Sequence, residues 1–387
     1  MRLTRLLLED FRSYATAELH PDAGLTIVAG PNGAGKTNLL EAIFVAVAGR
    51  SHRAGPDTEM VRYGRPFGRV RLDLADPQGS ATARVELILP GAEAPPEIRK
   101  RLTVNGLARR VTSVHDNVRV VLFRPEEMLL LVGAPGERRR FLDAILAQRD
   151  RRAARDLGEL ARVLAQRNAL LRSVWREEAS SDGLGFWDEA LATVGGRVTA
   201  ARLELVRDLD DRIPALHDAV APTEEIGDRV RLVYVDTLKD AWADRSAEPS
   251  ADELAAAYRR RLADVRQKEL WNGVSLVGPQ RDDLRVELGG REVATHASRG
   301  QQRTIILSLK LAERDLLSAG GPTPIVLLDD VFSELDADRS ERLLGLLLER
   351  GQVLVTMADL SALPAGRRGV AVWQVGEGRL SLTPRVA

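Results

Sequence analysis

The chain has 387 residues, of which 44% are hydrophobic and 29% charged, and its 56 basic side chains balance its 56 acidic ones. This length predicts two domains, or one domain with a large insertion, in a soluble protein. No apolar run approaches the roughly 18–20 residues that span a bilayer, and Glu9 and Asp10 do not fit a secretory signal. The absence of cysteine excludes disulfides, thiolate chemistry and cysteine-ligated zinc, which favours the cytoplasm. Because the net charge is zero, nucleic-acid binding would need a local basic patch.

Residues 1–124 are predicted to be rich in strands. Strand-like composition occurs at residues 3–8, 25–28, 70–74, 83–89, 101–104 and 118–123. The cluster Asp76–Gly79 is typical of a hairpin turn between the third and fourth of these segments. A helix-period pattern opens at Asn38 and is the one helical segment expected here.

Residues 30–37 carry the strongest chemical signal, since Gly-Pro-Asn-Gly-Ala-Gly-Lys-Thr fits the spacing G-x-x-x-x-G-K-[ST] between a strand and a helix. Glycines let backbone N–H groups turn toward phosphate oxygens, and the helix N-terminus adds partial positive charge. We expect Lys36 to reach the β- and γ-phosphates and act in catalysis, and Thr37 to hold Mg²⁺. A glycine-rich turn without a ligand is the alternative, but strand, loop and helix together favour a nucleoside triphosphate. The remaining residues expected around the nucleotide are Gly30, Asn32, Gly33, Gly35 and Asn38.

Ser51-His52-Arg53 follows the first helix closely, and two interpretations are open. The segment is either a solvated cap of the helix or a place where Arg53 contacts phosphate.

From Pro125 to about Gly273, Leu, Ala and Arg recur at helical spacing, which predicts an inserted helical arm. Ser180–Gly183 separates two apolar stripes, as the tip of a helical hairpin would. A strand-like stretch at 230–235 and a last helix around 254–270 follow. Arginine clusters occur at 138–140, 149–152 and 259–261. They either contact a phosphate backbone or form solvated faces paired with nearby carboxylates such as Glu137 and Asp150.

The last third of the chain holds the remaining chemistry. Ser298 precedes an apolar-periodic helix, and a serine in that position is ordinarily an N-cap. Residues 324–328 form a continuous apolar run that ends in Asp329 and Asp330, which predicts a strand buried on both faces with its carboxylates at the ligand-binding edge of the sheet. Asp329 is expected to hold Mg²⁺, and Asp330 to orient or deprotonate the attacking water. Val353–Thr356 is a further candidate core strand.

In this order the motifs resemble the ATP-binding-cassette head, in the branch of chromosome-maintenance and DNA-repair ATPases. The resemblance implies an α/β P-loop head with a mixed sheet (1–124 and 274–387), interrupted by the helical arm (125–273). In that class the signature serine of one subunit caps the γ-phosphate held by another, which implies an ATP-dependent homodimer. The signature positions are Ser298, Gly300 and Gln301, and those of the D-loop are Ser333 and Asp336.

The resemblance narrows to the RecF family of bacterial recombination mediators and covers nearly the whole chain. The blocks that carry it are Leu8–Tyr14, Gly35–Ile43, Ser51–Arg53, Phe123–Glu126, Arg138–Asp143 and Gly278–Asp283. It favours a phosphate contact for Arg53. It also implies a slow, DNA-stimulated ATPase that uses ATP and Mg²⁺ and acts on duplex or gapped DNA in the cytoplasm, associated with the nucleoid. The implied partners are RecR and RecO, and indirectly RecA.

Some positions depart from the usual cassette pattern. Asp330 stands where most cassette ATPases carry glutamate, and the switch histidine is replaced within Thr356–Asp359. Gln78 is the one glutamine between Asn38 and Pro125, so no magnesium-sensing glutamine is identified. Gln280 stands where the family block has histidine. A transporter motor subunit, a chromosome-organising ATPase and a small-molecule kinase remain alternatives. A transporter subunit would lack a helical arm of this length, and a chromosome-organising ATPase would need a much longer coiled coil. A small-molecule kinase would not need the signature serine.

Overall fold

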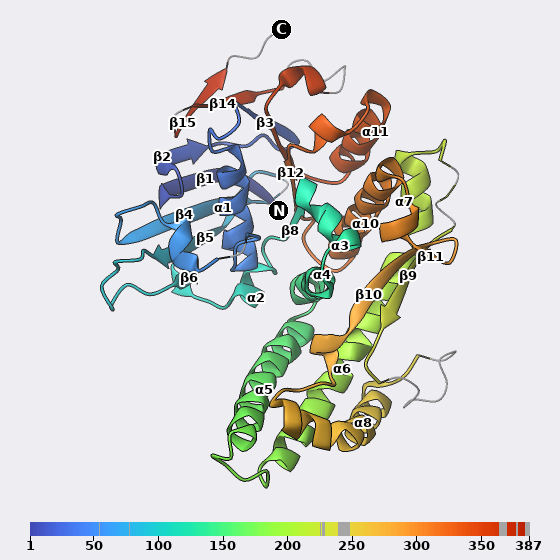
Figure 1. Cartoon of the computed structure of the whole chain (residues 1–387). Helices are drawn as coiled ribbons and strands as arrows, with labels where there is room; N and C mark the ends of the chain where they lie inside the picture. The colour runs from blue at the N-terminus through green and yellow to red at the C-terminus, as the bar shows by residue number, and fades with distance from the viewer. Residues whose placement is uncertain are drawn as a thin grey trace. The chain divides into compact units, whose positions relative to one another are not determined.

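A computed structural model describes residues 1–53, 55–76, 78–224, 226, 229–238, 248–363, 370–376 and 378–383 (Figure 1). The chain forms two compact units. The first contains residues 1–127, 216–223 and 307–387, and the second contains 128–215 and 224–306. This division does not test the functional segments 1–124, 125–273 and 274–387, which stay a prediction. Among the described residues, no helix has the length and apolar character needed to cross a membrane.

A mixed six-stranded sheet forms one half of the first unit, in the order β15-β14-β3-β13-β12-β8. All neighbours are parallel except β15, which is antiparallel to β14. Every residue of β3, β8 and β13 is buried, which confirms the strands predicted at 25–28, 118–123 and 353–356. The strands are β3 (Leu25–Ala29), β8 (Val120–Phe123), β12 (Ile325–Asp329), β13 (Val353–Met357), β14 (Val372–Gly376) and β15 (Arg379–Thr383).

An antiparallel sheet forms the other half, in the order β2-β1-β4-β5-β6-β7. Buried and more exposed residues alternate along β4 and β5, as expected for strands with one face on the core. The predicted hairpin between them is confirmed, although Pro77 of its turn lies outside the described residues. The strands are β1 (Arg2–Phe11), β2 (Tyr14–Leu19), β4 (Phe67–Ala75), β5 (Ala81–Pro90), β6 (Arg101–Val104) and β7 (Leu107–Ala108).

Helix α1 (Lys36–Ala48) contacts strands of both sheets, so its Leu39, Leu40 and Ile43 join one hydrophobic core with them. This position holds the N-terminus of α1 at the carboxyl end of β3. The other helical elements of the first unit are η1 (Asp57–Met60), α2 (Val111–Val114), η5 (Val331–Glu334), α11 (Ala337–Leu348) and η6 (Leu360–Ala362). The elements η2 (Pro125–Met128), α7 (Ile213–Val220) and α10 (Arg299–Ala319) have residues in both units.

The second unit contains the predicted helical hairpin, formed by α5 (Arg151–Trp175) and α6 (Leu184–Asp210). Helix α8 (Ala251–Asn272) packs against α6 so closely that a Cβ at Gly196 would lie 2.3 Å from the carbonyl oxygen of Ala251. A three-stranded sheet in the order β11-β10-β9 completes the unit, and of its strands only β9 was predicted. Its strands are β9 (Val230–Val235), β10 (Asp283–Leu288) and β11 (Arg291–Glu292), and the shorter helical elements are α3 (Leu129–Val132), α4 (Pro135–Arg149), η4 (Pro279–Arg281) and α9 (Val293–His296).

A buried ionic cluster ties the hairpin to α8. The Arg167 side chain is fully buried and donates hydrogen bonds to Asp188 (2.6 Å), Glu269 (2.6 Å) and the Ser275 hydroxyl (2.7 Å). Glu269, also fully buried, accepts in addition from the Leu276 backbone N–H. Because each charge has a partner, the cluster avoids the cost of an uncompensated buried ion.

Candidate nucleotide site

The loop between β3 and α1 requires glycine at three positions. Gly33 and Gly35 have φ angles of +80° and +109°, which residues with a side chain rarely adopt. A Cβ at Gly30 would lie 2.4 Å from the Val375 carbonyl oxygen, and one at Gly35 would lie 2.8 Å from Ser13 Oγ. The backbone therefore wraps tightly above the N-terminus of α1, as the spacing predicts.

Lys36 is fixed inside this loop. Its side chain is buried, and Nζ donates hydrogen bonds to the carbonyl oxygens of Gly30 (2.8 Å) and Pro31 (3.0 Å). An ammonium group has three N–H donors, so one remains for a phosphate oxygen. The lysine thus stabilises the loop by donating to two of its backbone carbonyls and also places a positive charge there.

Thr37 and Asp329 meet although they are far apart in sequence. Thr37 Oγ1, in the first turn of α1, donates to Asp329 Oδ1 at the end of β12 (3.0 Å). Thr356 Oγ1, on β13, donates to the same carboxylate oxygen (2.6 Å). A hydroxyl and a carboxylate side by side are oxygen ligands of the kind that Mg²⁺ prefers, so these residues fit the metal expected here.

Asp330 marks the point where the chain leaves the sheet. Its φ of +52° is in the left-handed region, and its N–H donates to the Thr356 carbonyl oxygen (3.1 Å). Ser333 Oγ donates to the Asp330 carbonyl oxygen (2.7 Å), which closes the turn. Asp336 caps α11 by accepting from the Arg339 N–H (2.9 Å). Backbone strain of this kind concentrates at functional sites, and Asp330 directly follows the carboxylate beside Thr37.

Ser298, in the second unit, has the geometry of a helix cap. Its Oγ accepts from the Gln301 N–H (3.2 Å), and Gln301 Oε1 accepts from the Ser298 N–H (2.9 Å). The Gly300 carbonyl oxygen accepts from Thr304 Oγ1 (3.2 Å). This reciprocal pair is a capping box, and the Ser298 side chain stays exposed. A role toward a partner copy's phosphate stays a prediction, since one chain alone does not test it.

Glu41, which the sequence analysis did not single out, holds several side chains in place beside the phosphate loop. Glu41, fully buried on α1, accepts two hydrogen bonds from Arg12 (2.9 and 2.6 Å) and one from Ser51 Oγ (2.6 Å). Arg53 lies 3.4 Å from its second oxygen. Burial opposes ionisation, but the hydrogen bonds from Arg12 and Ser51 outweigh it and lower the pKa of Glu41. One signal was available, because Glu41 interrupts an otherwise apolar run of helix.

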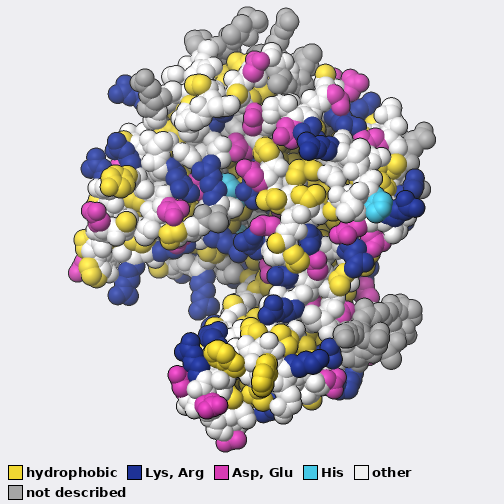
Figure 2. Space-filling model, viewed as in Figure 1, with side chains coloured by type: hydrophobic (Ala, Val, Ile, Leu, Met, Phe, Trp, Pro, Cys, Tyr) yellow, Lys and Arg dark blue, Asp and Glu magenta, His cyan; other side chains and the backbone are white. Residues whose placement is uncertain are grey.

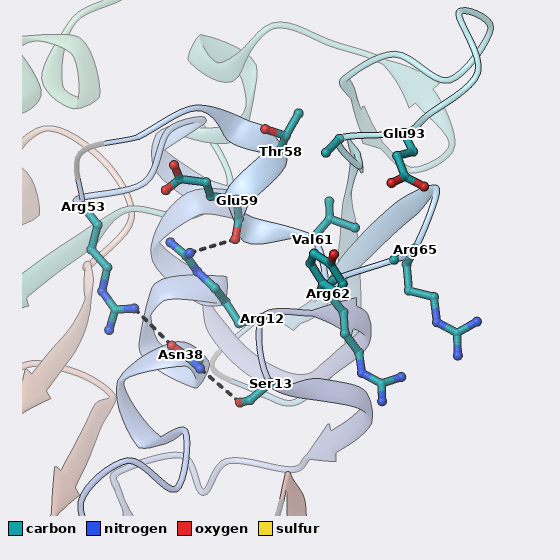
Figure 3. A pocket seen from close by; sticks show the side chains of 13 residues that line it. Arg12, Ser13, Asn38, Arg53, Thr58, Glu59, Val61, Arg62, Arg65 and Glu93 are labelled. Atoms are coloured by element: carbon teal, nitrogen blue, oxygen red, sulfur yellow. Dashed lines mark hydrogen bonds between the residues drawn. The ribbon is translucent and has the colours of Figure 1, made fainter.

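A pocket of about 620 Å³ opens beside this cluster (Figure 3). Arg53 donates to Asn38 Oδ1 (3.1 Å), and Asn38 Nδ2 donates to Ser13 Oγ (3.0 Å), so these two contacts, drawn as dashed lines in Figure 3, link the pocket wall to α1. Ser13 also adjoins Gly35 of the loop. The phosphate loop and the pocket are therefore neighbours, and Arg53 lies at the boundary between them.

Fold and site together define a P-loop ATPase head of the ATP-binding-cassette type, with an inserted helical arm. Residues 2–379 match the family described as RecF/RecN/SMC N terminal domain. The chain belongs to the RecF family of DNA replication and repair proteins.

Two curated relatives are named DNA replication and repair protein RecF. The one from Kineococcus radiotolerans is 41% identical over 385 residues, which cover 95% of this chain and 96% of the relative. The one from Roseiflexus castenholzii is 37% identical over 405 residues, with 98% and 99% covered. The family resemblance inferred from the motifs is confirmed.

Two solved structures are similar in fold. The first, of the recombination mediator protein RecF-ATPrS in the RecFOR pathway, superposes with a TM-score of 0.86 at 26% identity and covers 98% of each chain. The second is an Smc head bound to the C-terminal winged-helix domain of ScpA, with a TM-score of 0.55, 14% identity and 99% and 97% covered. The Smc likeness concerns the fold alone, and the predicted head architecture is confirmed by both.

Proposed function

We propose that this protein is an ATP-gated clamp on DNA that acts in recombinational gap repair. ATP binding brings two copies together, the closed homodimer holds duplex DNA beside a single-stranded gap, and slow hydrolysis releases it. The observation that carries this proposal is the contact of Thr37 with Asp329 at the mouth of an intact phosphate loop. Membership of the RecF family and likeness to the ATPrS-bound mediator support it.

The residues of this loop divide the work on ATP. Thr37 and Asp329 would hold Mg²⁺, which supplies charge neutralisation on the phosphates when bound. Lys36 would contribute a second positive charge, and the N–H groups at the start of α1 would donate to the phosphate oxygens. Asp330 orients the attacking water. An aspartate is one methylene shorter than the usual glutamate and reaches that water less readily, which favours slow turnover, stimulated when DNA holds the dimer closed.

The pocket beside the loop is the proposed place of the nucleoside. Its volume of about 620 Å³ lies within the range of roughly 300–1,000 Å³ typical of small-molecule sites. Its wall includes Asn38, the residue that follows Thr37, so a triphosphate in the loop leads directly into it. Arg12 and Arg53 supply fixed cations where the pocket meets the loop.

The second half of the site comes from a partner copy in this proposal. Ser298, Gly300 and Gln301 would cap the γ-phosphate in trans. The side chains of Ser298 and Ser333 are exposed in the single chain, so a partner copy can reach them. RecR and RecO are the proposed partners, and loading of RecA on gapped DNA is the proposed outcome. The proposed location is the cytoplasm, at the nucleoid.

A chromosome-organising role is the second candidate, because the Smc head shares the fold. It fits less well, since α5 and α6 have 25 and 27 residues and so extend only about 40 Å at 1.5 Å per residue. That reach is short for bridging distant DNA segments.

Binding of duplex DNA with and without a non-hydrolysable ATP analogue tests the clamp. The analogue should tighten binding, because only the closed dimer presents both copies to one duplex. Lys36→Ala should abolish this enhancement while leaving the affinity without nucleotide unchanged. Equal affinity of the unmodified protein with and without the analogue would show that ATP does not gate DNA binding.

A further inference from the structure

Residues 98–111 of the first unit carry five basic side chains and no acidic one. Arg99, Lys100 and Arg101 lead into β6, and Arg109 and Arg110 follow β7, the outermost strand of the antiparallel sheet. All five are exposed. Figure 2 shows Lys and Arg side chains projecting from this unit where β6 and α2 lie.

Hydrogen bonds and close packing join these side chains to Arg50 in one surface. The Arg109 N–H donates to the Leu102 carbonyl oxygen (3.0 Å), which places the two ends of the hairpin side by side. Lys100 Nζ donates to the Gly49 carbonyl oxygen (2.7 Å), directly before Arg50. A Cβ at Gly49 would lie 2.2 Å from Val111, the residue after Arg110. We call this surface the basic edge, and its members are Arg50, Arg99, Arg101, Arg109 and Arg110.

The basic edge keeps its charge available. In the described part of the chain, none of its five arginines has a carboxylate within ion-pair distance, and Arg99 and Arg109 donate only to neighbouring backbone carbonyls. Lys100 differs, because its ammonium also lies 2.6 Å from Asp57 Oδ2. Lys100 therefore anchors the strand to the end of α1, and the arginines around it face solvent.

The arginine clusters of the arm, for which the sequence left both phosphate contact and pairing with carboxylates open, are arranged differently. Arg138 is paired with Asp283 (2.7 Å), Arg149 with Asp208 (2.7 Å) and Arg259 with Glu189 (2.7 Å). Arg140 is paired with Glu137. For these four side chains the interpretation as acid-paired faces holds, and a phosphate would have to displace a carboxylate first.

We propose that the basic edge binds the phosphate backbone of duplex DNA. This inference rests on the proposed clamp function and names the surface of each copy that the DNA touches. Exposed, unpaired arginines bind phosphates without reading sequence, and they release counterions from the duplex as they do so. An edge strand also carries charge in many proteins to prevent pairing with other sheets, so the test has to separate the two roles.

Salt titrations of duplex binding in the presence of the non-hydrolysable ATP analogue provide the test. Arg109→Ala/Arg110→Ala should reduce the magnitude of the slope of log affinity against log salt by about 1.8, which is two contacts at about 0.9 each. Arg109→Lys/Arg110→Lys keeps the charge and should keep the slope. Arg84→Ala/Arg259→Ala removes the same net charge from two exposed arginines that are paired with Asp73 and Glu189, and should also keep it.

Each remaining outcome decides the matter. An unchanged slope in Arg109→Ala/Arg110→Ala overturns the assignment, and if light scattering shows that this variant aggregates, protection of the edge strand is the role of the arginines. An equal loss of slope in the charge-matched control would also overturn it, because net charge alone would then explain the effect. If the unmodified protein binds no duplex at all, the clamp function itself fails. Failure of the basic edge alone is distinguished by normal binding of the unmodified protein.

Discussion

At the scale of single residues, Glu41 connects the phosphate loop to the pocket wall. It lies one helical turn beyond Thr37 and holds Arg12, Ser51 and Arg53 at once. Without its negative charge, the two guanidinium groups would repel each other and lose a fixed position. A residue of this kind acts on a ligand through the arginines that it holds.

We therefore expect Glu41→Gln to weaken ATP binding about tenfold, which corresponds to about 1.4 kcal/mol. It should also lower the free energy of unfolding by about 3–5 kcal/mol, as the loss of one partner of a buried pair does. Glu269→Gln is the matched control, since Glu269 is equally buried and holds Arg167 in the second unit. Equilibrium titration with a fluorescent ATP analogue, alongside urea unfolding, measures both quantities.

The Glu269→Gln control separates an effect of Glu41 on the position of the arginines from a general loss of stability. If both variants lose stability and both bind ATP with unchanged affinity, Glu41 is a structural ion pair and no more. In an Arg53→Ala background the effect of Glu41→Gln on ATP affinity should shrink, because part of it is exerted through Arg53.

We expect His52 to make the stability of this region depend on pH. Burial, together with the nearby charge of Arg124, lowers the pKa of His52 to about 4, and its ring packs edge-on against Phe44. Between pH 6.5 and 4, His52 is protonated in the unfolded chain but neutral in the folded chain. The free energy of unfolding therefore decreases as the pH falls through this window. At pH 5 the loss is about 2 kcal/mol relative to pH 7.

His52→Gln removes the titrating group and should flatten this part of the pH profile. Urea unfolding of both proteins at pH 7 and pH 5 measures the difference, because other titrating groups contribute equally to the two. A decrease in stability that is the same in both proteins would mean that His52 titrates normally in the folded state.

The residues that sequence spacing identified are those whose geometry is local. Lys36 and Thr37 are adjacent to the glycines that define their loop, and the apolar run before Asp329 specifies the end of a buried strand. The Arg12–Glu41 pair is different, because its partners come from different elements and meet only after the antiparallel sheet has packed on α1. No local pattern indicates such a contact.

At the scale of elements, α6 and α8 approach each other at Gly196. A Cβ there would lie 2.3 Å from the Ala251 carbonyl oxygen and 2.8 Å from the Ala255 nitrogen, both of them backbone atoms that cannot rotate away. The glycine is thus a packing requirement of the arm, in spite of its low helix propensity.

Gly196→Ala should therefore destabilise the second unit by about 1–3 kcal/mol, as overpacking does. Gly158→Ala, at an exposed position of α5 with no atom within 4 Å of the new Cβ, should stabilise it by about 0.5–1 kcal/mol. Thermal unfolding of the two variants measures the contrast. The prediction fails if Gly196→Ala is as stable as the unmodified protein.

Elements with an uninterrupted apolar run, such as β12 and β13, were predictable because burial on both faces leaves a clear pattern. The short strand β10 was missed, since Asp283, Arg285 and Glu287 alternate with its apolar residues and one of its faces is polar. Its pairing with β9 is a contact across about 50 residues of chain, which composition does not reveal.

At the scale of the whole molecule, Ser298 distinguishes the proposed ATP site, shared between two copies, from the site of an ordinary single-chain ATPase. Ser298→Arg should block ATP-dependent dimerisation and hydrolysis by its bulk, while each copy still binds ATP in its own loop. Ser298→Ala removes only the hydroxyl and should cost about 1 kcal/mol of helix capping in addition to any loss in hydrolysis. Sedimentation with the ATP analogue and a phosphate-release assay measure the two effects. Normal dimerisation and hydrolysis by Ser298→Arg would mean that the serine is only a helix cap.

The position of β3 in its sheet has a consequence for how the protein is made. β3 is synthesised within the first 30 residues, yet both of its neighbours, β13 and β14, come from beyond residue 350. At roughly 5–20 residues per second, about 330 residues of synthesis leave this strand without its partners for roughly 15–65 seconds. On the ribosome the phosphate loop is therefore among the first segments to emerge and among the last to become competent. A truncated chain that ends before β13 should hold the complete loop sequence and bind no nucleotide.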